Sequence, residues 1–158
     1  MACRNLGVLF DTCVFVPCLM QKAGFSGTLF EIVRNDGFYM VMCDFLLDEY
    51  VRVADRECLG SGSLVKHILD SLRKESIIEW AKPVNQSTAK AGKQKDQPVV
   101  DCAIEGEKKA HILVTEDTNH FMISWPRDPV LKVIGYRDFI DKHQRENICS
   151  DCKQGRFH

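Results

Sequence analysis

The stretch GVLFDTCVFV, residues 7–16, is an apolar run interrupted by one acid, Asp11, and by Thr12. A short, continuous apolar run is typical of a buried strand, and we expect that strand at residues 6–10. A carboxylate at the end of a buried strand costs free energy unless a partner neutralises it. The partner could be a hydrogen-bonding turn, a basic side chain or a bound cation, and the rest of the chain has to decide among these.

Strands and helices are expected to alternate along the rest of the chain, with a polar segment at 83–95 that reads as a mobile loop. In the helix at 44–58, Phe45, Leu46, Tyr50 and Val53 should form the inner face, with Asp44 as N-cap. Such alternation predicts an α/β fold, a three-layer α/β/α sandwich around a parallel sheet of four or five strands. Further strands are predicted at 38–43, 76–82, 111–115 and 131–135, and helices at 26–37, 44–58, 63–75, 96–110 and 136–147.

The composition fits one soluble globular domain, which we place at residues 1–145, followed by a polar C-terminal tail at 146–158. The chain has 158 residues, 45% of them hydrophobic and 27% charged, and a formal net charge of −1. No apolar run has the length of a membrane span, and the N-terminus lacks the features of a signal peptide, so we expect a cytoplasmic protein without a membrane partner. Eight cysteines lie mostly in apolar or periodic segments, which favours free thiols over a disulfide framework.

Four acids fall at related places in this pattern. Asp11 follows the first strand and Asp117 the fourth, Asp96 opens the helix before that fourth strand, and Glu49 lies just after the second strand. Ligands of parallel α/β sheets bind outside the carboxyl ends of the strands, so we expect these acids on one rim. They have no obvious basic partners and would repel one another, which divalent cations would relieve. We therefore interpret Asp11 as a metal ligand.

Four motifs carry these acids in a fixed order: FDTC at 10–13, CDFLLDE at 43–49, DQPVV at 96–100 and LVTEDTN at 113–119. In this order and spacing they resemble the PIN-domain nucleases over about residues 6–140, most closely the toxin-like ribonucleases of toxin–antitoxin pairs in bacteria and archaea. The resemblance implies metal-dependent hydrolysis of RNA phosphodiesters. Asp11, Glu49, Asp96 and Asp117 would hold one or two Mg²⁺ or Mn²⁺ ions. It also implies a homodimer and a protein antitoxin as partners beside the RNA substrate.

Three departures from the family pattern keep an alternative function open. Cys13 stands where the family has asparagine, Cys43 stands where it has serine, and the segment from Asp96 to Asp117 is slightly longer than usual. The alternative is a catalytically inactive PIN fold that serves as an RNA-binding or scaffold module. Phosphatases of the haloacid dehalogenase type and receiver domains also place aspartates after strands. The phosphatases need a second acid two residues after the first, which DTC lacks. Receiver domains need paired acids near the N-terminus, and these are also missing.

Each acid also has a simpler interpretation. An aspartate after a strand often only forms a turn, Asp96 can be only a helix cap, and Glu49 can be a solvated helix acid. The third acid of the site is ambiguous, because counting back from Asp117 favours Asp101 whereas the proline in DQPVV favours Asp96 at a helix N-terminus. The two lie about 140° apart around a helix, so both cannot easily point into one pocket, and we predict Asp96 with Asp101 as the alternative.

Six further residues are candidate substrate contacts. Hydroxyl groups in such positions more often cap the backbone, Asn119 can simply end a strand, and lysines in a polar loop are most simply solvated. The lysines nevertheless precede Asp96 directly, which would bring them near a phosphate backbone that enters the site. The candidates are Thr12, Thr115, Asn119, Lys90, Lys93 and Lys95.

The C-terminal tail contains a symmetric pattern of two histidines around a Cys-x2-Cys pair: His143, Cys149, Cys152 and His158. Such a set could complete a tetrahedral Zn²⁺ site. The spacing is not that of a standard zinc finger, and polar tails are more often disordered, so the zinc site is an option and not part of the main interpretation.

Overall fold

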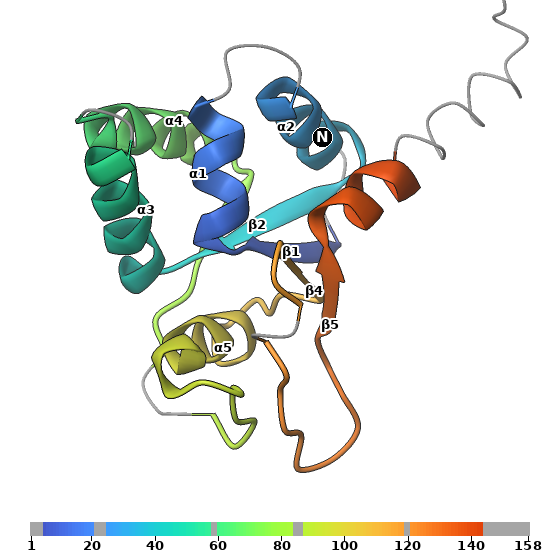
Figure 1. Ribbon diagram of the computed structural model, residues 1–158. Helices are drawn as coiled ribbons and strands as arrows, with labels where there is room; N and C mark the ends of the chain where they lie inside the picture. The colour runs from blue at the N-terminus through green and yellow to red at the C-terminus, as the bar shows by residue number, and fades with distance from the viewer. Residues whose placement is uncertain (1–4, 21–24, 58–59, 84–86, 119–120, 144–158) are drawn as a thin grey trace, which may run out of the picture.

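A computed structural model describes residues 5–20, 25–57, 60–83, 87–118 and 121–143 (Figure 1). Every strand predicted from the sequence is present, although the third is shorter than expected, and residues 136–143 are helical as predicted. The proposed tail at 146–158 lies outside the described residues. The strands are β1 (Leu6–Phe10), β2 (Phe38–Met42), β3 (Ile78–Trp80), β4 (Ile112–Thr115) and β5 (Lys132–Gly135). The helices are α1 (Thr12–Met20), α2 (Phe25–Asn35), α3 (Asp44–Glu57), α4 (Gly62–Lys74) and α5 (Gln97–Ile104), preceded by the short 3-10 helix η1 (Gln94–Asp96).

The strands form one parallel sheet in the order β3-β2-β1-β4-β5. Helices α1 and α2 lie on one side of this sheet and α5 lies on the other (Figure 1). The predicted α/β/α sandwich with a parallel sheet is therefore confirmed, with five strands. Because β1 is central, its carboxyl end lies between those of β2 and β4, where the sequence places three of the four candidate acids.

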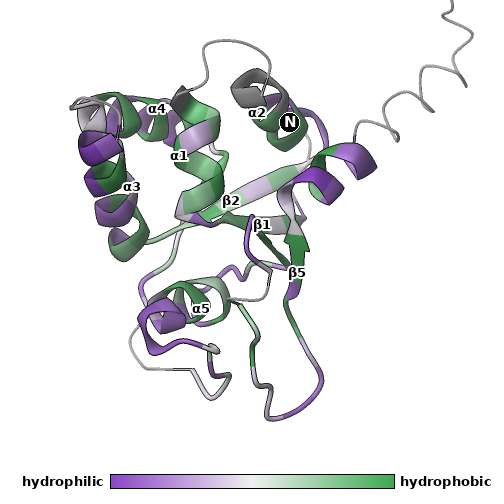
Figure 2. Cartoon of the chain, viewed as in Figure 1, coloured by the Kyte–Doolittle hydropathy of each residue, from purple (hydrophilic) through white to green (hydrophobic). Residues whose placement is uncertain are grey.

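Both faces of the sheet are buried, which explains why β1 and β2 are continuous apolar runs. Val8, Leu9 and Phe10 are each 0% exposed, although they alternate between the two faces. On one face, the ring of Phe139 from the 136–143 helix lies 5.8 Å from the ring of Phe10, centroid to centroid. Figure 2 shows that hydrophobic residues gather in the strands, whereas polar residues lie on the outer surfaces of α3 and of the 136–143 helix.

The predicted inner face of α3 is wrong in one residue. The buried residues of this helix are Leu46, Tyr50 and Ala54, which are spaced by four and so form one stripe. Phe45 is 38% exposed, because it is turned about 100° from Leu46 around the helix axis.

The predicted N-cap of α3 is also wrong. The amide of Leu47 bonds to the carbonyl of Cys43, which places Cys43 at the cap. Asp44 instead accepts a hydrogen bond from the indole Nε1 of Trp80 at 3.0 Å, which ties the start of α3 to β3.

The polar segment at 83–95, expected to be a mobile loop, is anchored where the structure describes it. Ser87 and Ala89 are both 2% exposed, and Lys90 pairs with Ser124 through two backbone hydrogen bonds. The side chain of Gln97 donates to the carbonyl of Ala89 and accepts from a backbone amide of the same segment, each at 3.0 Å. The sequence concealed this because the anchoring residues are small or polar and show no periodicity. No helix among the described residues is both long and apolar enough to cross a membrane.

Candidate active site

Asp11 lies where β1 passes directly into α1. Its amide donates to the carbonyl of Val114 in β4 at 2.9 Å, and its own carbonyl accepts the first hydrogen bonds of α1, from Val14 and Phe15. The carboxylate accepts three hydrogen bonds, from the Thr12 amide at 2.8 Å and from two side chains described next. A negative charge at a helix N-terminus is also favourable. Of the three partners considered for this acid, the hydrogen-bonding turn is therefore present.

Thr115 connects Asp11 to the other central acid. Its hydroxyl donates to Oδ2 of Asp11 at 2.9 Å and accepts from the backbone amide of Asp117 at 3.2 Å. Thr115 is 0% exposed, at the end of β4. Thr115 therefore lies where it can position Asp11 and Asp117, and its contact with substrate remains a prediction.

Cys13, which replaces the asparagine of the family pattern, is the second side chain on Asp11. Its Sγ donates to Oδ2 of Asp11 at 3.0 Å and lies 3.7 Å from the hydroxyl of Thr115. The residue lies at an exposed edge, but desolvation of the inward-facing sulfur, together with the charge of Asp11, raises the pKa of the thiol to about 11. The thiol keeps its proton at neutral pH and remains a donor to the carboxylate. Cys43, the other substituted position, is buried against Cys102, and the hydrogen bond between the two thiols lowers the pKa of Cys43.

One cleft of about 920 Å³ lies at the carboxyl ends of the central strands. Asp11, Glu49, Asp96 and Asp117 all line it, from the junction of β1 and α1, from α3, from η1 and from the segment after β4. The fold thus brings together the four acids that the sequence analysis singled out, and their role as ligands remains a prediction. The side chains of Thr12, Cys13 and Lys95 also line the cleft, as do Pro17, Phe45, Arg52, Val53, Arg56, Glu57, Val99, Glu116 and Phe121.

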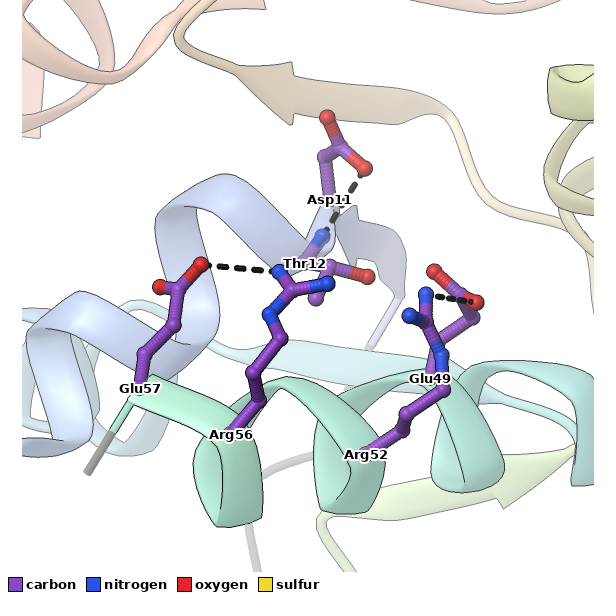
Figure 3. A network of polar contacts seen from close by, with 6 residues as sticks. All are labelled: Asp11, Thr12, Glu49, Arg52, Arg56 and Glu57. Atoms are coloured by element: carbon purple, nitrogen blue, oxygen red, sulfur yellow. Dashed lines mark hydrogen bonds and ion pairs between the residues drawn. The ribbon is translucent and has the colours of Figure 1, made fainter. Parts of the chain in front are cut away.

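The expectation that these acids have no basic partners is wrong. Nη2 of Arg52 lies 2.7 Å from Oε1 of Glu49, one helical turn away on α3. Arg56, on the next turn, lies 2.8 Å from its neighbour Glu57 (Figure 3). The spacing of three between Glu49 and Arg52 is visible in the sequence and could have revealed this pair.

Asp96 and Asp101 have different surroundings. Asp96 precedes α5 at its N-terminus, lines the cleft, and makes no side-chain capping hydrogen bond to that helix. Oδ1 of Asp101 accepts from the amide of Ser87 at 2.8 Å and from Nε2 of Gln97 at 2.9 Å. Asp101 does not line the cleft, and its carboxylate anchors the segment around Ser87.

The predicted lysine contacts are separated by the fold. Lys95 lines the cleft directly before Asp96. The amine of Lys90 donates to the carbonyl of Ser87 at 3.2 Å, within the anchored segment. Lys93 is exposed and is not among the residues that line the cleft. Asn119 lies outside the described residues.

Glu116 was missed by the sequence analysis, although it stands beside Asp117 in the VTED motif and also lines the cleft. Of the four residues considered for zinc, Cys149, Cys152 and His158 lie outside the described residues. His143 is 7% exposed, and its Nδ1 lies 2.9 Å from Oδ2 of Asp36. Its ring also packs on Phe38 and Phe139, in the core.

The chemistry of the donors that line the cleft fits a hard divalent cation, which binds carboxylate oxygens. Within the described ranges, no three His, Cys, Asp or Glu side chains are close enough together to hold one ion as they stand. Glu49 is directed to Arg52 and would have to turn from it to join Asp11. The residues are suitable ligands, but the cation would have to draw them together.

The acids that line this cleft lie in a part of the chain that matches a known protein family. A family model described as "PIN domain" matches residues 7–119, a range that includes all four acids. The searches for similar curated proteins and for similar solved structures gave no match. The chain therefore belongs to the PIN-domain family, whose members are generally nucleases that act on RNA and typically use divalent metal ions.

Proposed function

We propose that this protein is an Mg²⁺- or Mn²⁺-dependent endoribonuclease that hydrolyses RNA phosphodiester bonds in the cleft at the carboxyl ends of the sheet. The observation that carries the proposal is the convergence of Asp11, Glu49, Asp96 and Asp117, from four separate elements, on one cleft. Two-metal nuclease chemistry needs carboxylates gathered at one site in this way.

In this proposal, Asp11 and Asp117 are the central ligands, because Thr115 and the Thr12 amide hold Asp11 in one orientation. Glu49 and Asp96 approach from the two walls of the cleft. These carboxylates would hold a cation that, when bound, would make water a better nucleophile towards phosphorus and would offset charge on the leaving oxygen. Lys95 contacts the phosphate backbone beside Asp96.

The direct test is cleavage of an end-labelled single-stranded RNA with Mn²⁺, with Mg²⁺ and with a chelator. Asp11→Asn and Asp117→Asn should reduce the rate at least 100-fold, since each would remove a ligand to the cation. Asp48→Asn is the matched control, because Asp48 is an exposed acid of α3 beside Glu49 that does not line the cleft. Chelator-resistant cleavage, or an active Asp11→Asn variant, would refute the proposal.

A second measurement does not depend on activity. Millimolar Mn²⁺ should raise the melting temperature of the wild-type protein, because a ligand that binds only the folded state stabilises it. The increase should disappear in Glu49→Gln and persist in Asp48→Asn. Equal melting curves with Mn²⁺ and with chelator would count against a metal site.

The alternative function is a catalytically inactive PIN fold that binds RNA or acts as a scaffold. Two observations favour it: Cys13 replaces the family's asparagine, and Glu49 is paired with Arg52. Such a protein would bind RNA without cleaving it under any metal, and its melting temperature would not respond to Mn²⁺. The two measurements above therefore distinguish the functions.

The resemblance to toxin-like PIN nucleases also suggests a role for the protein in the cell. We infer a cytoplasmic toxin that forms a homodimer and is neutralised by a protein antitoxin. Light scattering of the purified protein tests the dimer. Growth arrest on expression of the wild-type protein, but not of Asp11→Asn, tests the toxin, and rescue by the product of a neighbouring small gene tests the antitoxin.

A further inference from the structure

The α3 wall of the cleft carries two arginines that the proposed metal chemistry does not use. Arg52 and Arg56 are four residues apart, so they lie on one stripe of the helix, with their Cβ atoms about 5–6 Å apart. Both line the cleft, and both side chains are 58% exposed. In Figure 3 they rise from neighbouring turns of α3 on the side where Asp11 and Thr12 lie.

The excess of negative charge in the cleft gives these arginines a role toward an anionic substrate. Six carboxylates line it, those of Asp11, Glu49, Glu57, Asp96, Glu116 and Asp117. The only cationic side chains that line it are those of Arg52, Arg56 and Lys95, counted over the described residues. A phosphodiester that approaches the acids is repelled, and fixed cations on the walls offset that repulsion. Lys95 lies on the η1 side, so the two arginines supply the cations of the α3 side.

The present partners of the arginines can be exchanged at little cost. Arg52 pairs with Glu49 and Arg56 with Glu57, and both pairs are exposed to solvent. Exposed ion pairs contribute little to stability, because water screens them. A guanidinium group can bind a phosphate through two parallel hydrogen bonds, a geometry that lysine cannot match. A phosphate in the cleft therefore competes well for either arginine.

We propose that Arg52 and Arg56 form a phosphodiester-binding subsite on α3, and that Arg52 changes partner, from Glu49 to an RNA phosphate, when a divalent cation takes the Glu49 carboxylate. The inference rests on the proposed function. It couples the two ligands, because the cation releases Arg52 for RNA, and RNA that holds Arg52 releases Glu49 for the cation. Such coupling is reciprocal: each ligand raises the affinity of the other by the same factor.

The coupling gives the Arg52→Gln variant two opposite effects. Without Arg52, Glu49 is free for the cation, so the Mn²⁺ concentration that gives half of the melting-temperature increase should fall by about twofold to fivefold. The same variant should raise KM for a short single-stranded RNA about tenfold, with little change in kcat, because a charge-assisted contact to phosphate is lost. Arg56→Gln should raise KM similarly and leave the Mn²⁺ response unchanged, since Arg56 does not hold Glu49.

Binding in chelator gives a third readout, in which no cleavage occurs. Fluorescence anisotropy with labelled RNA at several salt concentrations should show a slope of log Kd against log salt that decreases by about 0.7 in Arg56→Gln. The decrease should be smaller in Arg52→Gln, because without a cation Glu49 still competes for Arg52. Arg34→Gln is the matched control, because Arg34 is an exposed arginine paired with Glu75 at 3.0 Å, away from the cleft. It should leave KM, salt slope and Mn²⁺ response unchanged.

The outcomes separate this inference from the proposed function. A wild-type protein that does not cleave RNA with either cation would refute the proposed function itself. An active wild-type enzyme whose Arg52→Gln and Arg56→Gln variants keep its KM and salt slope would refute only the subsite. A normal Mn²⁺ response in Arg52→Gln would refute the exchange of partners.

Discussion

The hydroxyl of Thr115 donates to Oδ2 of Asp11 over 2.9 Å, so that the ends of two paired central strands are joined at the cleft. The hydroxyl oxygen of Thr115 also accepts a hydrogen bond from the backbone amide of Asp117 at 3.2 Å. One buried side chain thus sets the orientation of one candidate ligand and the backbone position of another. Mutation of groups that orient metal ligands commonly costs about 10–100-fold in metal affinity or activity.

Thr115→Val keeps the shape of the side chain and removes its hydroxyl. We expect RNA cleavage and Mn²⁺ affinity to fall by about 10–100-fold, because Asp11 loses the bond that orients it. Thr115→Ser keeps the hydroxyl and should retain most of both. Initial cleavage rates and Mn²⁺-dependent melting of the two variants test this, and full activity in Thr115→Val would show that Asp11 does not need this bond.

Asp96→Asn and Asp101→Asn should fail in different ways. Asp96 lines the cleft, so its variant should lose cleavage and the Mn²⁺-induced increase in melting temperature. Asp101 anchors Ser87 and Gln97, so its variant should keep the Mn²⁺ response and loosen the segment at 87–95. Limited proteolysis should then cut that segment faster in Asp101→Asn than in Asp96→Asn. The reverse pattern would make Asp101 the ligand.

Lys95→Ala should weaken RNA binding, whereas Lys93→Ala should not. The two substitutions remove the same charge two residues apart, but of these two lysines only Lys95 lines the cleft. The Kd of Lys95→Ala in chelator should rise, and its slope against salt should decrease by about 0.7, as for the loss of one phosphate contact. Equal effects of both variants would indicate a general electrostatic attraction and no specific contact at Lys95.

The sequence predicted the strands and most of the helices, because the signals that define them are local. It did not predict helix α1 (Thr12–Met20), whose residues are almost all apolar and so show no helical periodicity, and it made the helix at 96–110 longer than α5. Strands buried on both faces are continuous apolar runs, as at residues 6–10, and an acid after such a strand must lie at the rim of the sheet. These two signals were enough to predict that Asp11 and Asp117 lie at one edge of the sheet. Glu49 and Asp96 were predicted as ligands from the resemblance to the PIN-domain family as much as from their position in the sequence.

The contacts that the sequence did not predict depend on residues that the fold brings together. Asp101 anchors Ser87 across fourteen residues, and Thr115 meets Asp11 across 104, so neither bond has a local signal. The pairing of Arg52 with Glu49 was local and was missed for another reason. Position after a strand indicates which residues reach the rim, whereas the partner of Glu49 is indicated by the spacing of three along α3.

Tyr50→Phe tests how the core supports the site. Tyr50 is 0% exposed, its hydroxyl donates to the carbonyl of Phe10, the residue before Asp11, and its ring stacks on Phe15 at 4.4 Å. Burial raises the pKa of Tyr50 well above its usual value, so the hydroxyl remains a donor. The substitution keeps the ring and leaves a buried carbonyl without this donor, which should cost about 1–3 kcal/mol of unfolding free energy.

Tyr39→Phe is the matched control for this core contact. The hydroxyl of Tyr39 also donates to a backbone carbonyl, that of Lys109 at 2.7 Å, but the contact is only partly buried. Water can replace that donor, so the loss of melting temperature should be clearly smaller than in Tyr50→Phe, for which each kcal/mol corresponds to about 2–4 °C. Thermal and urea unfolding of both variants measure the difference. Equal losses would mean that the bond from α3 to the end of β1 contributes no more than a surface contact, and that Asp11 is held by its own hydrogen bonds alone.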